Sequence, residues 1–199
     1  MKDAVFLSAS VPDPRRDPAF YGTGDVVAIR EAVRALAAVV LPRGLLVFGG
    51  HPAITPLVLQ VGRAVGHVGS VRIYQSRYFE RVVPPEARAI PGLVWVDAVD
   101  DERDASLLAM RQRMLGAHRW KAAIFIGGME GVLDEFALVQ QLPYTVPCLP
   151  VGSTGAAAEQ LLGRQRLGMS AQLAASLATD SVYGALFEQL LWPGTGPRP

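Results

Sequence analysis

The chain alternates short apolar runs with stretches in which apolar residues recur every three or four positions. Residues 4–9, 45–48 and 122–126 are apolar runs of strand length. Residues 26–40 instead carry valine, isoleucine and leucine at helical spacing. Strands that alternate with helices in this way form a parallel sheet covered on both faces. We therefore predict an α/β protein: a Rossmann-like three-layer fold, with a mainly parallel sheet of about six strands and helices on both faces.

The same reading divides the chain into elements and a single domain. The predicted strands cover residues 4–9, 45–48, 71–75, 93–96, 122–126 and 146–151. The predicted helices cover residues 26–40, 54–65, 101–115, 131–142, 156–165 and 170–191, and proline-rich loops fill residues 10–23 and 77–92. No repeat or change in composition marks a boundary, so we predict one domain over residues 1–191 and a flexible tail over 192–199.

Composition excludes several classes of function. The 199 residues include 19 Lys and Arg against 18 Asp and Glu, which gives a net charge of +1. Nucleic-acid binding rests on clustered positive charge, so this balance argues against it. No apolar run approaches the ~18 residues that a membrane span needs. Cys148 is the single cysteine, which indicates a core residue and a reducing compartment. We predict a cytoplasmic protein that binds neither nucleic acid nor a membrane.

Small residues and glycines follow four of the predicted strands. Ligands of open parallel sheets bind at the carboxyl ends of the strands, where glycine lets backbone N–H groups approach a phosphate. Glycine also ends strands for steric reasons, but three glycine turns on one edge favour a phosphate-bearing ligand. The candidate ligand-binding residues are Ser8, Ser10, Gly49, Gly50, His51, Gly127, Gly128, Met129, Glu130, Gly131, Glu135, Ser153, Thr154 and Gly155.

Glu135 is the strongest single candidate among them. It follows Gly131 by four residues, on the first turns of a helix that begins at the glycine turn. Its carboxylate either accepts hydrogen bonds from ribose hydroxyls, stabilises positive charge as an N-glycosidic bond breaks, or lies on a helix surface. His51 either donates to a phosphate or caps the following helix. Arg15 and Arg16 either reach over a phosphate or belong to a solvated loop.

Familiar cofactor motifs are absent. No Gly-x-Gly-x-x-Gly follows the first strand, and no Gly-x-x-x-x-Gly-Lys-Ser/Thr occurs anywhere in the chain. The three histidines have no metal-ligand spacing. The sequence thus disfavours a standard dinucleotide dehydrogenase and a P-loop NTPase, and we predict no cofactor and no metal.

The glycine turn that ends in Glu135 resembles the signature of the SLOG superfamily, which includes the Lonely Guy phosphoribohydrolases and nucleotide-sensing domains of bacterial conflict systems. Residues 6–10, 48–52 and 153–157 also look like the sensor branch, and the closest resemblance is to the stand-alone cluster-3 SLOG family. The resemblance covers roughly residues 4–165. It implies a sensor of an ADP-ribose derivative or of a cyclic or mononucleotide, within an antiviral or conflict system.

The resemblance to the hydrolases is weaker. Ile126 stands where they have proline, Val132 where they have threonine, and Met129-Glu130 lengthens the glycine spacing by one residue. Arg111 and Arg113 are loose candidates for the Arg-Lys pair of those enzymes. The alternative is therefore a nucleotide phosphoribohydrolase, an N-glycosidase with Glu135 as its catalytic carboxylate.

The resemblance also implies partners. Sensors of this kind act on a separate effector such as a TIR-domain protein. Related proteins are often homodimers, and the apolar stretch over residues 173–191 would supply an interface for a homodimer or a higher homo-oligomer.

Overall fold

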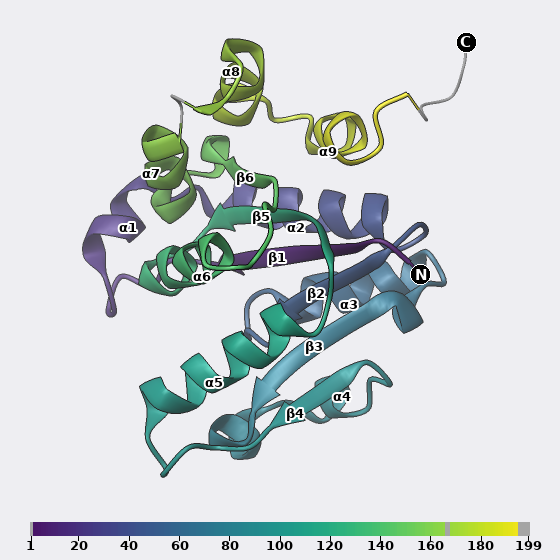
Figure 1. Ribbon diagram of the computed structural model, residues 1–199, viewed down its shortest axis with the longest axis vertical. Coiled ribbons are helices and arrows are strands. Elements are labelled where there is room, and N and C mark those ends of the chain that lie inside the picture. Colours follow the sequence, from purple (N-terminus) through teal and green to yellow (C-terminus); the bar gives the residue numbers. More distant parts are fainter. Residues whose placement is uncertain (1, 166–167, 195–199) are drawn as a thin grey trace.

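The computed structural model describes residues 2–165 and 168–194, and it contains one six-stranded sheet (Figure 1). Every pair of neighbouring strands is parallel, and the spatial order is β4-β3-β2-β1-β5-β6. The strands are β1 (Ala4–Ser10), β2 (Leu45–Gly49), β3 (Val71–Ser76), β4 (Leu93–Val96), β5 (Trp120–Gly127) and β6 (Cys148–Val151). The predicted Rossmann-like α/β fold is confirmed.

Helices cover both faces of this sheet and make three layers. Side chains of α2, α3, α8 and α9 belong to the core on one face, side chains of α5 and α6 to the core on the other, and α7 contributes to both. The longer helices are α2 (Val26–Val40), α3 (Thr55–Ala64), α5 (Arg103–Gly116), α6 (Glu130–Gln140), α7 (Ala156–Gln165), α8 (Ala171–Thr179) and α9 (Tyr183–Leu191). The short ones are α1 (Pro18–Thr23), α4 (Pro85–Arg88), η1 (Val68–Ser70), η2 (Arg77–Val82) and η3 (Gly152–Thr154).

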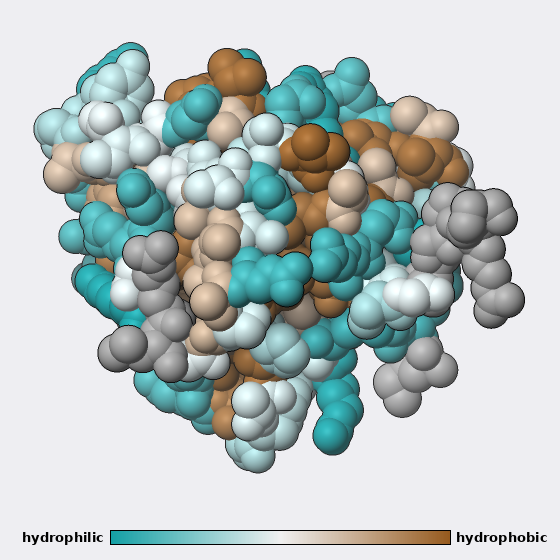
Figure 2. All heavy atoms as spheres, turned by 90° about the horizontal axis from the view of Figure 1, so that it is seen from above, coloured by the Kyte–Doolittle hydropathy of each residue, from teal (hydrophilic) through white to brown (hydrophobic). Residues whose placement is uncertain are grey.

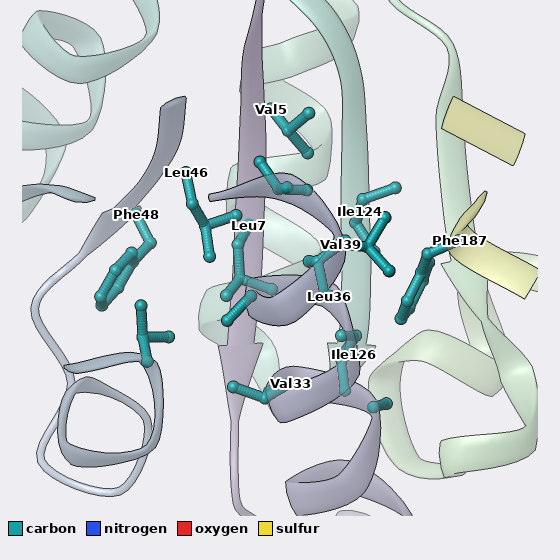
Figure 3. Packing of buried hydrophobic residues seen from close by; sticks show 14 of the residues in the cluster. Val5, Leu7, Val33, Leu36, Val39, Leu46, Phe48, Ile124, Ile126 and Phe187 are labelled. Atoms are coloured by element: carbon teal, nitrogen blue, oxygen red, sulfur yellow. The ribbon is translucent and has the colours of Figure 1, made fainter. Parts of the chain in front are cut away.

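Helix α2 shows how the sequence pattern builds the larger core. Val33, Leu36 and their helical neighbours are buried and face Leu7 of β1 and Ile124 of β5 (Figure 3). The helix begins where the Asp25 carboxylate accepts the N–H groups of residues 27 and 28. Apolar spacing and a side-chain cap thus agree, and the helix has the predicted bounds.

Three segments differ from the prediction, and one of them is the predicted loop over 77–92, which contains the short helices η2 and α4. Residues 18–23 form a helix inside the predicted loop over 10–23, because the Asp17 carboxylate caps its first turn and Pro18 has a backbone geometry suited to that turn. The predicted helix over 170–191 is two helices, since α8 ends at Thr179 and α9 begins at Tyr183. The break falls at the polar residues Thr179, Asp180 and Ser181, which interrupt the apolar pattern on either side.

The strand order places a topological switch at the centre of the sheet. From β1 the chain builds β2, β3 and β4 on one side, and then returns to add β5 and β6 on the other. The two connections leave β1 and β5 in opposite directions, so a crevice forms outside their carboxyl ends. Ser10 is paired in register with Gly127 at this point. Two of the predicted ligand turns therefore start side by side.

The end of the described chain packs back on the sheet. The Trp192 ring lies between two cations, with the Arg43 guanidinium 5.2 Å and the Lys121 ammonium 5.4 Å from its centre. Residues 195–199 of the predicted flexible tail lie outside the described residues. Among the described helices, none combines the length and the apolar character needed to cross a membrane.

Candidate ligand-binding site

A large cavity opens at the carboxyl edge of the sheet, over the switch point. Its volume is about 1260 Å³, above the roughly 300–1,000 Å³ of typical small-molecule sites. Its walls come from the turns after β1, β2 and β5, and from α3, η2, α5 and α6. Eight predicted ligand-binding residues line it: Ser10, Gly49, Gly50, His51, Met129, Glu130, Gly131 and Glu135.

Glu135 is held in this cavity by two side chains from distant parts of the chain. Ser8 Oγ donates to its Oε2 at 2.5 Å, and Arg111 Nε donates to its Oε1 at 3.3 Å. Only 13 % of the Glu135 side chain is exposed. Burial raises the pKa of this carboxyl above its ordinary value, and the Arg111 charge and the Ser8 hydrogen bond only partly oppose the shift. Ser8 itself does not line the cavity, so its part is to orient the carboxylate.

Arg111 connects α5 to the start of α6. Besides the bond to Glu135, its Nη1 lies 3.2 Å from Asp134 Oδ2, and its Nη2 donates to the Gly131 carbonyl at 3.4 Å. The side chain is 14 % exposed and lines the cavity. Of the two arginines considered for the Arg-Lys pair, Arg111 is therefore beside Glu135, whereas Arg113 is exposed and does not line the cavity.

Gly49, the last residue of β2, and the adjacent Gly50 face the two opposite sides of the sheet within the cavity lining. A Cβ at Gly49 would lie 3.3 Å from Met110 Cε and 3.8 Å from Glu135 Oε1, on the α5 and α6 side of the sheet. A Cβ at Gly50 would overlap with the Gln75 side chain, on the α3 side. We call these two sides of the cavity the charged branch, which holds Glu135 and Arg111, and the apolar branch, which holds Gln75. The backbone of Gly49 and Gly50 lines both branches, because glycine has no side chain to cover it.

His51 adds a neutral donor next to the glycine pair. Burial, and secondarily the Arg16 charge, lowers the pKa of its imidazole from 6.5 to about 4. Its Nδ1 accepts the N–H of Ala53 at 3.2 Å. The proton of the neutral ring therefore resides on Nε2, which is left as a hydrogen-bond donor.

Two guanidinium groups in the cavity wall are available to an anion. Arg16 precedes α1 and Arg63 lies in the last turn of α3, and both line the cavity. Neither forms an ion pair with any carboxylate in the part of the chain that the structure describes. Helix α6 also begins at the cavity without a side-chain cap, which leaves N–H groups of its first turn unbonded. These groups make the centre of the cavity suitable for phosphate.

Two of the predicted glycines serve the backbone and its packing. Gly127 and Gly128 have φ angles of 55° and 89°, which residues other than glycine rarely adopt. A Cβ at Gly127 would overlap with Ile29 of α2, and one at Gly128 would overlap with Val132 of α6. Neither residue lines the cavity. They shape the turn that presents Met129, Glu130 and Gly131.

The turn after β6 is also used inside the protein. Thr154 is fully buried, donates to the Val151 carbonyl at 2.6 Å and accepts the Gly127 N–H at 2.9 Å. Ser153 Oγ donates to the Asp180 carbonyl at 2.9 Å, and Gly155 packs against Thr23. None of these three residues lines the cavity. The structure thus separates this turn from the other three and gives it a supporting role behind β5.

Sequence reasoning missed the residues of the apolar branch. Phe48, Ile73 and Gln75 line the cavity at the ends of β2 and β3, and Phe79 and Val83 come from the predicted loop. Alternation along β3 places Gln75 on the same face as Ile73. A polar residue at an inward position of an apolar strand was the signal that could have identified it.

Comparison with known proteins agrees with this architecture. Among the curated proteins compared with the chain, none matches it. The sequence profile of the SLOG cluster3 family matches residues 19–191, which takes in all of α1 but its first residue and every later helix and strand of the described chain. The match covers most of the chain, and the structure has the Rossmann-like sheet with the glycine turn at its switch point. The protein therefore belongs to the SLOG cluster3 family.

Proposed function

We propose that the protein is a cytoplasmic sensor that binds a nucleotide-derived ligand in the cavity over the β1–β5 switch point. The single observation that carries the proposal is the convergence of three turns and a buried, oriented carboxylate on one cavity. Family membership is consistent with a nucleotide-related function. The ligand is an ADP-ribose derivative or a cyclic or mononucleotide.

The chemistry of the cavity supports this class of ligand. Glu135 has accepted two hydrogen bonds, and a carboxylate has about four acceptor positions, so it can still accept from ribose hydroxyls. Phosphate would lie by the unpaired Arg16, the His51 Nε2–H and the N–H groups at the start of α6. These groups carry positive or partially positive charge. They line the same cavity as Gly49, where an added Cβ would point to Glu135 in the charged branch.

One observation favours a second candidate, a phosphoribohydrolase. Arg111 lies on the helix that precedes β5 and donates to Glu135, so the cavity holds a carboxylate and a cation at the place where an N-glycosidic bond would break. The same contact favours binding over catalysis. The Arg111 guanidinium neutralises the negative charge of Glu135, and that charge is what would stabilise an oxocarbenium-like transition state. We therefore retain hydrolysis as the alternative.

The test is a panel of nucleoside monophosphates, NAD, ADP-ribose and cyclic nucleotides, measured by thermal shift and isothermal titration. Each mixture is then analysed by chromatography for released base. We expect at least one compound to stabilise the protein and to be recovered intact. Released base together with a ribose phosphate would make the protein a hydrolase and overturn the sensor proposal.

Glu135→Gln separates the two candidates more finely. In a sensor, loss of the charged acceptor weakens binding by about 1.5–3 kcal/mol, roughly ten- to hundredfold, with no turnover in either form. In a hydrolase, turnover falls about 10²–10⁴-fold while affinity changes little. Glu159→Gln is the matched control, because Glu159 is an exposed acid on α7 that does not line the cavity.

We further propose that the signal passes to a separate effector such as a TIR-domain protein, in an antiviral or conflict system, and that the protein acts as a homodimer or higher homo-oligomer. The face formed by α8 and α9 mixes hydrophobic and hydrophilic residues in small groups (Figure 2). Most of its larger apolar side chains point into the core, but Val182 is 71 % exposed between the two helices. Sedimentation velocity of the wild type and of Val182→Asp tests whether this face pairs copies of the chain.

A further inference from the structure

The apolar branch is built as a second compartment of the cavity. Most of its walls are apolar side chains, those of Phe48, Ile54, Leu59, Ile73, Phe79 and Val83, and the Arg63 guanidinium also lines the cavity from the last turn of α3. They come from both sides of a space between α3 and η2, outside the ends of β2 and β3. Apolar walls of this kind bind a group whose removal from water costs little free energy, such as the faces of a planar aromatic ring.

Gln75 places one amide in this apolar compartment. The residue is only 7 % exposed, lines the cavity and packs with its Oε1 against Gly50. Its side chain has no hydrogen-bond partner among the residues whose side chains the structure describes. Most buried side-chain amides have partners, because a buried donor or acceptor without one is costly. Such an amide at the wall of a cavity indicates a partner that arrives with the ligand.

The chemistry of an amide specifies that partner. It offers a donor and an acceptor side by side, and nucleobases present adjacent acceptors and donors on their edges. A base held between apolar walls, with its edge against Gln75, would satisfy both requirements. The glycine pair lies between the two polar side chains, because a Cβ at Gly50 would meet Gln75 Oε1 and a Cβ at Gly49 would come 3.8 Å from Glu135 Oε1.

We propose that the apolar branch binds the nucleobase of the ligand and that Gln75 determines base specificity by hydrogen bonding to the base edge. This inference rests on the proposed function and adds to it the location of the base. In an ADP-ribose derivative, the distal ribose then faces Glu135 in the charged branch, and the diphosphate lies between the two branches, near His51 and Arg16.

The test compares wild type with Gln75→Leu by isothermal titration. The probes are AMP, GMP, UMP, CMP and ADP-ribose, with ribose 5-phosphate as the reference that has no base. We expect the wild type to bind its preferred nucleotide more tightly than ribose 5-phosphate. Gln75→Leu should lose about tenfold in affinity for that nucleotide, with no change for ribose 5-phosphate. Gln140→Leu, which removes an exposed amide outside the cavity, should change neither.

The melting temperature of the unliganded variant separates recognition from a structural role. Because Gln75→Leu replaces an unpartnered buried amide by an apolar group of similar size, we expect it to melt at or above the wild-type temperature. A lower melting temperature with an equal loss of affinity for ribose 5-phosphate would show a structural role and overturn the inference. Unchanged nucleotide affinities in Gln75→Leu would overturn it while leaving the proposed function standing. A wild type that binds none of the nucleotides would overturn both.

Discussion

At the residue scale, the site depends on a carboxylate that the fold removes from water. Ser8 and Glu135 are 127 positions apart, and Arg111 belongs to a third element, yet all three meet at one pair of oxygens. The arrangement gives Glu135 a fixed orientation at the cost of desolvating it. Its pKa is raised because burial outweighs its two partners.

The pH dependence of stability follows from that shift. A carboxyl whose folded pKa exceeds its unfolded value binds a proton more readily in the folded state. Its favourable contribution is therefore complete below the ordinary value of 4.5 and is lost as pH rises through the raised folded pKa. We predict that the free energy of unfolding of the wild type falls relative to that of Glu135→Gln as pH rises above 4.5, as measured by urea unfolding. A difference that stays constant, or that grows with pH, would contradict burial as the dominant influence.

His51 should titrate in the opposite sense. Its folded pKa of about 4 lies below the ordinary 6.5, so the unfolded chain binds the proton first as pH falls. The stabilising contribution is complete above pH 6.5 and is lost as pH falls toward 4. NMR of the ring protons should place the His51 midpoint near pH 4, and a midpoint at or above 6.5 would show that the ring is solvated.

The two neighbouring arginines before α1 offer a matched test of the phosphate position. Arg16 lines the cavity, whereas the adjacent Arg15 does not. We predict that Arg16→Gln weakens binding of ADP-ribose about five- to tenfold, because one charge-assisted hydrogen bond to an exposed group is lost. Arg15→Gln should bind as the wild type does in the same titration. Equal effects of both substitutions would mean that the loop acts only through its total charge.

At the scale of elements, apolar periodicity with a side-chain cap was sufficient to predict α2. The repeat over residues 26–40 and the Asp25 cap define the same helix. The loop residues before it gave a weaker signal, because prolines and charges around Asp17 obscured a helix of six residues. The break between α8 and α9 did have a local signal, the polar residues Thr179, Asp180 and Ser181, but the apolar stretches on both sides favoured one continuous helix. Local sequence thus predicts elements best where pattern and cap coincide.

The site was predictable only in part, for a related reason. Parallel topology alone implies that the turns after β1, β2 and β5 meet at one edge. It does not say which turn faces the cavity, and the Ser153–Gly155 turn faces the interior because Thr154 bonds to Gly127 and Val151. The contact of Arg111 with Glu135 depends on how α5 packs against α6, which no local pattern encodes, whereas the alternation along β3 was a local signal for Gln75.

Two glycines around α7 provide a test of the supporting turn. Gly155 has a φ of 70°, and a Cβ there would overlap with the Thr23 carbonyl oxygen. We predict that Gly155→Ala lowers the free energy of unfolding by about 1–3 kcal/mol, through strain and displacement of α1. Gly163→Ala, inside α7 with open space around it, should raise the free energy of unfolding by up to about 1 kcal/mol. Chemical denaturation measures both, and a neutral Gly155→Ala would show that the turn can relax.

At the scale of the whole molecule, the position of β1 between β2 and β5 determines where ligand chemistry can occur. The strand order brings Ser10 beside Gly127 and sets the glycine pair of β2 next to them. The helices on the two faces then supply different walls, charged from α5 and α6 and apolar from α3. One cavity thereby gains two branches of different chemistry, which suits a ligand that joins a base to a ribose phosphate.

The most direct measurement is an NMR titration of the isotope-labelled protein with ADP-ribose, recording backbone amide shifts and the ligand's own signals together. We predict that the largest changes occur at Ser10, at 49–51 and at 129–131, while the ligand remains intact. Changes confined to other parts of the surface, or none at millimolar ligand, would contradict a nucleotide site in this cavity. Conversion of the ligand during the titration would instead identify an enzyme.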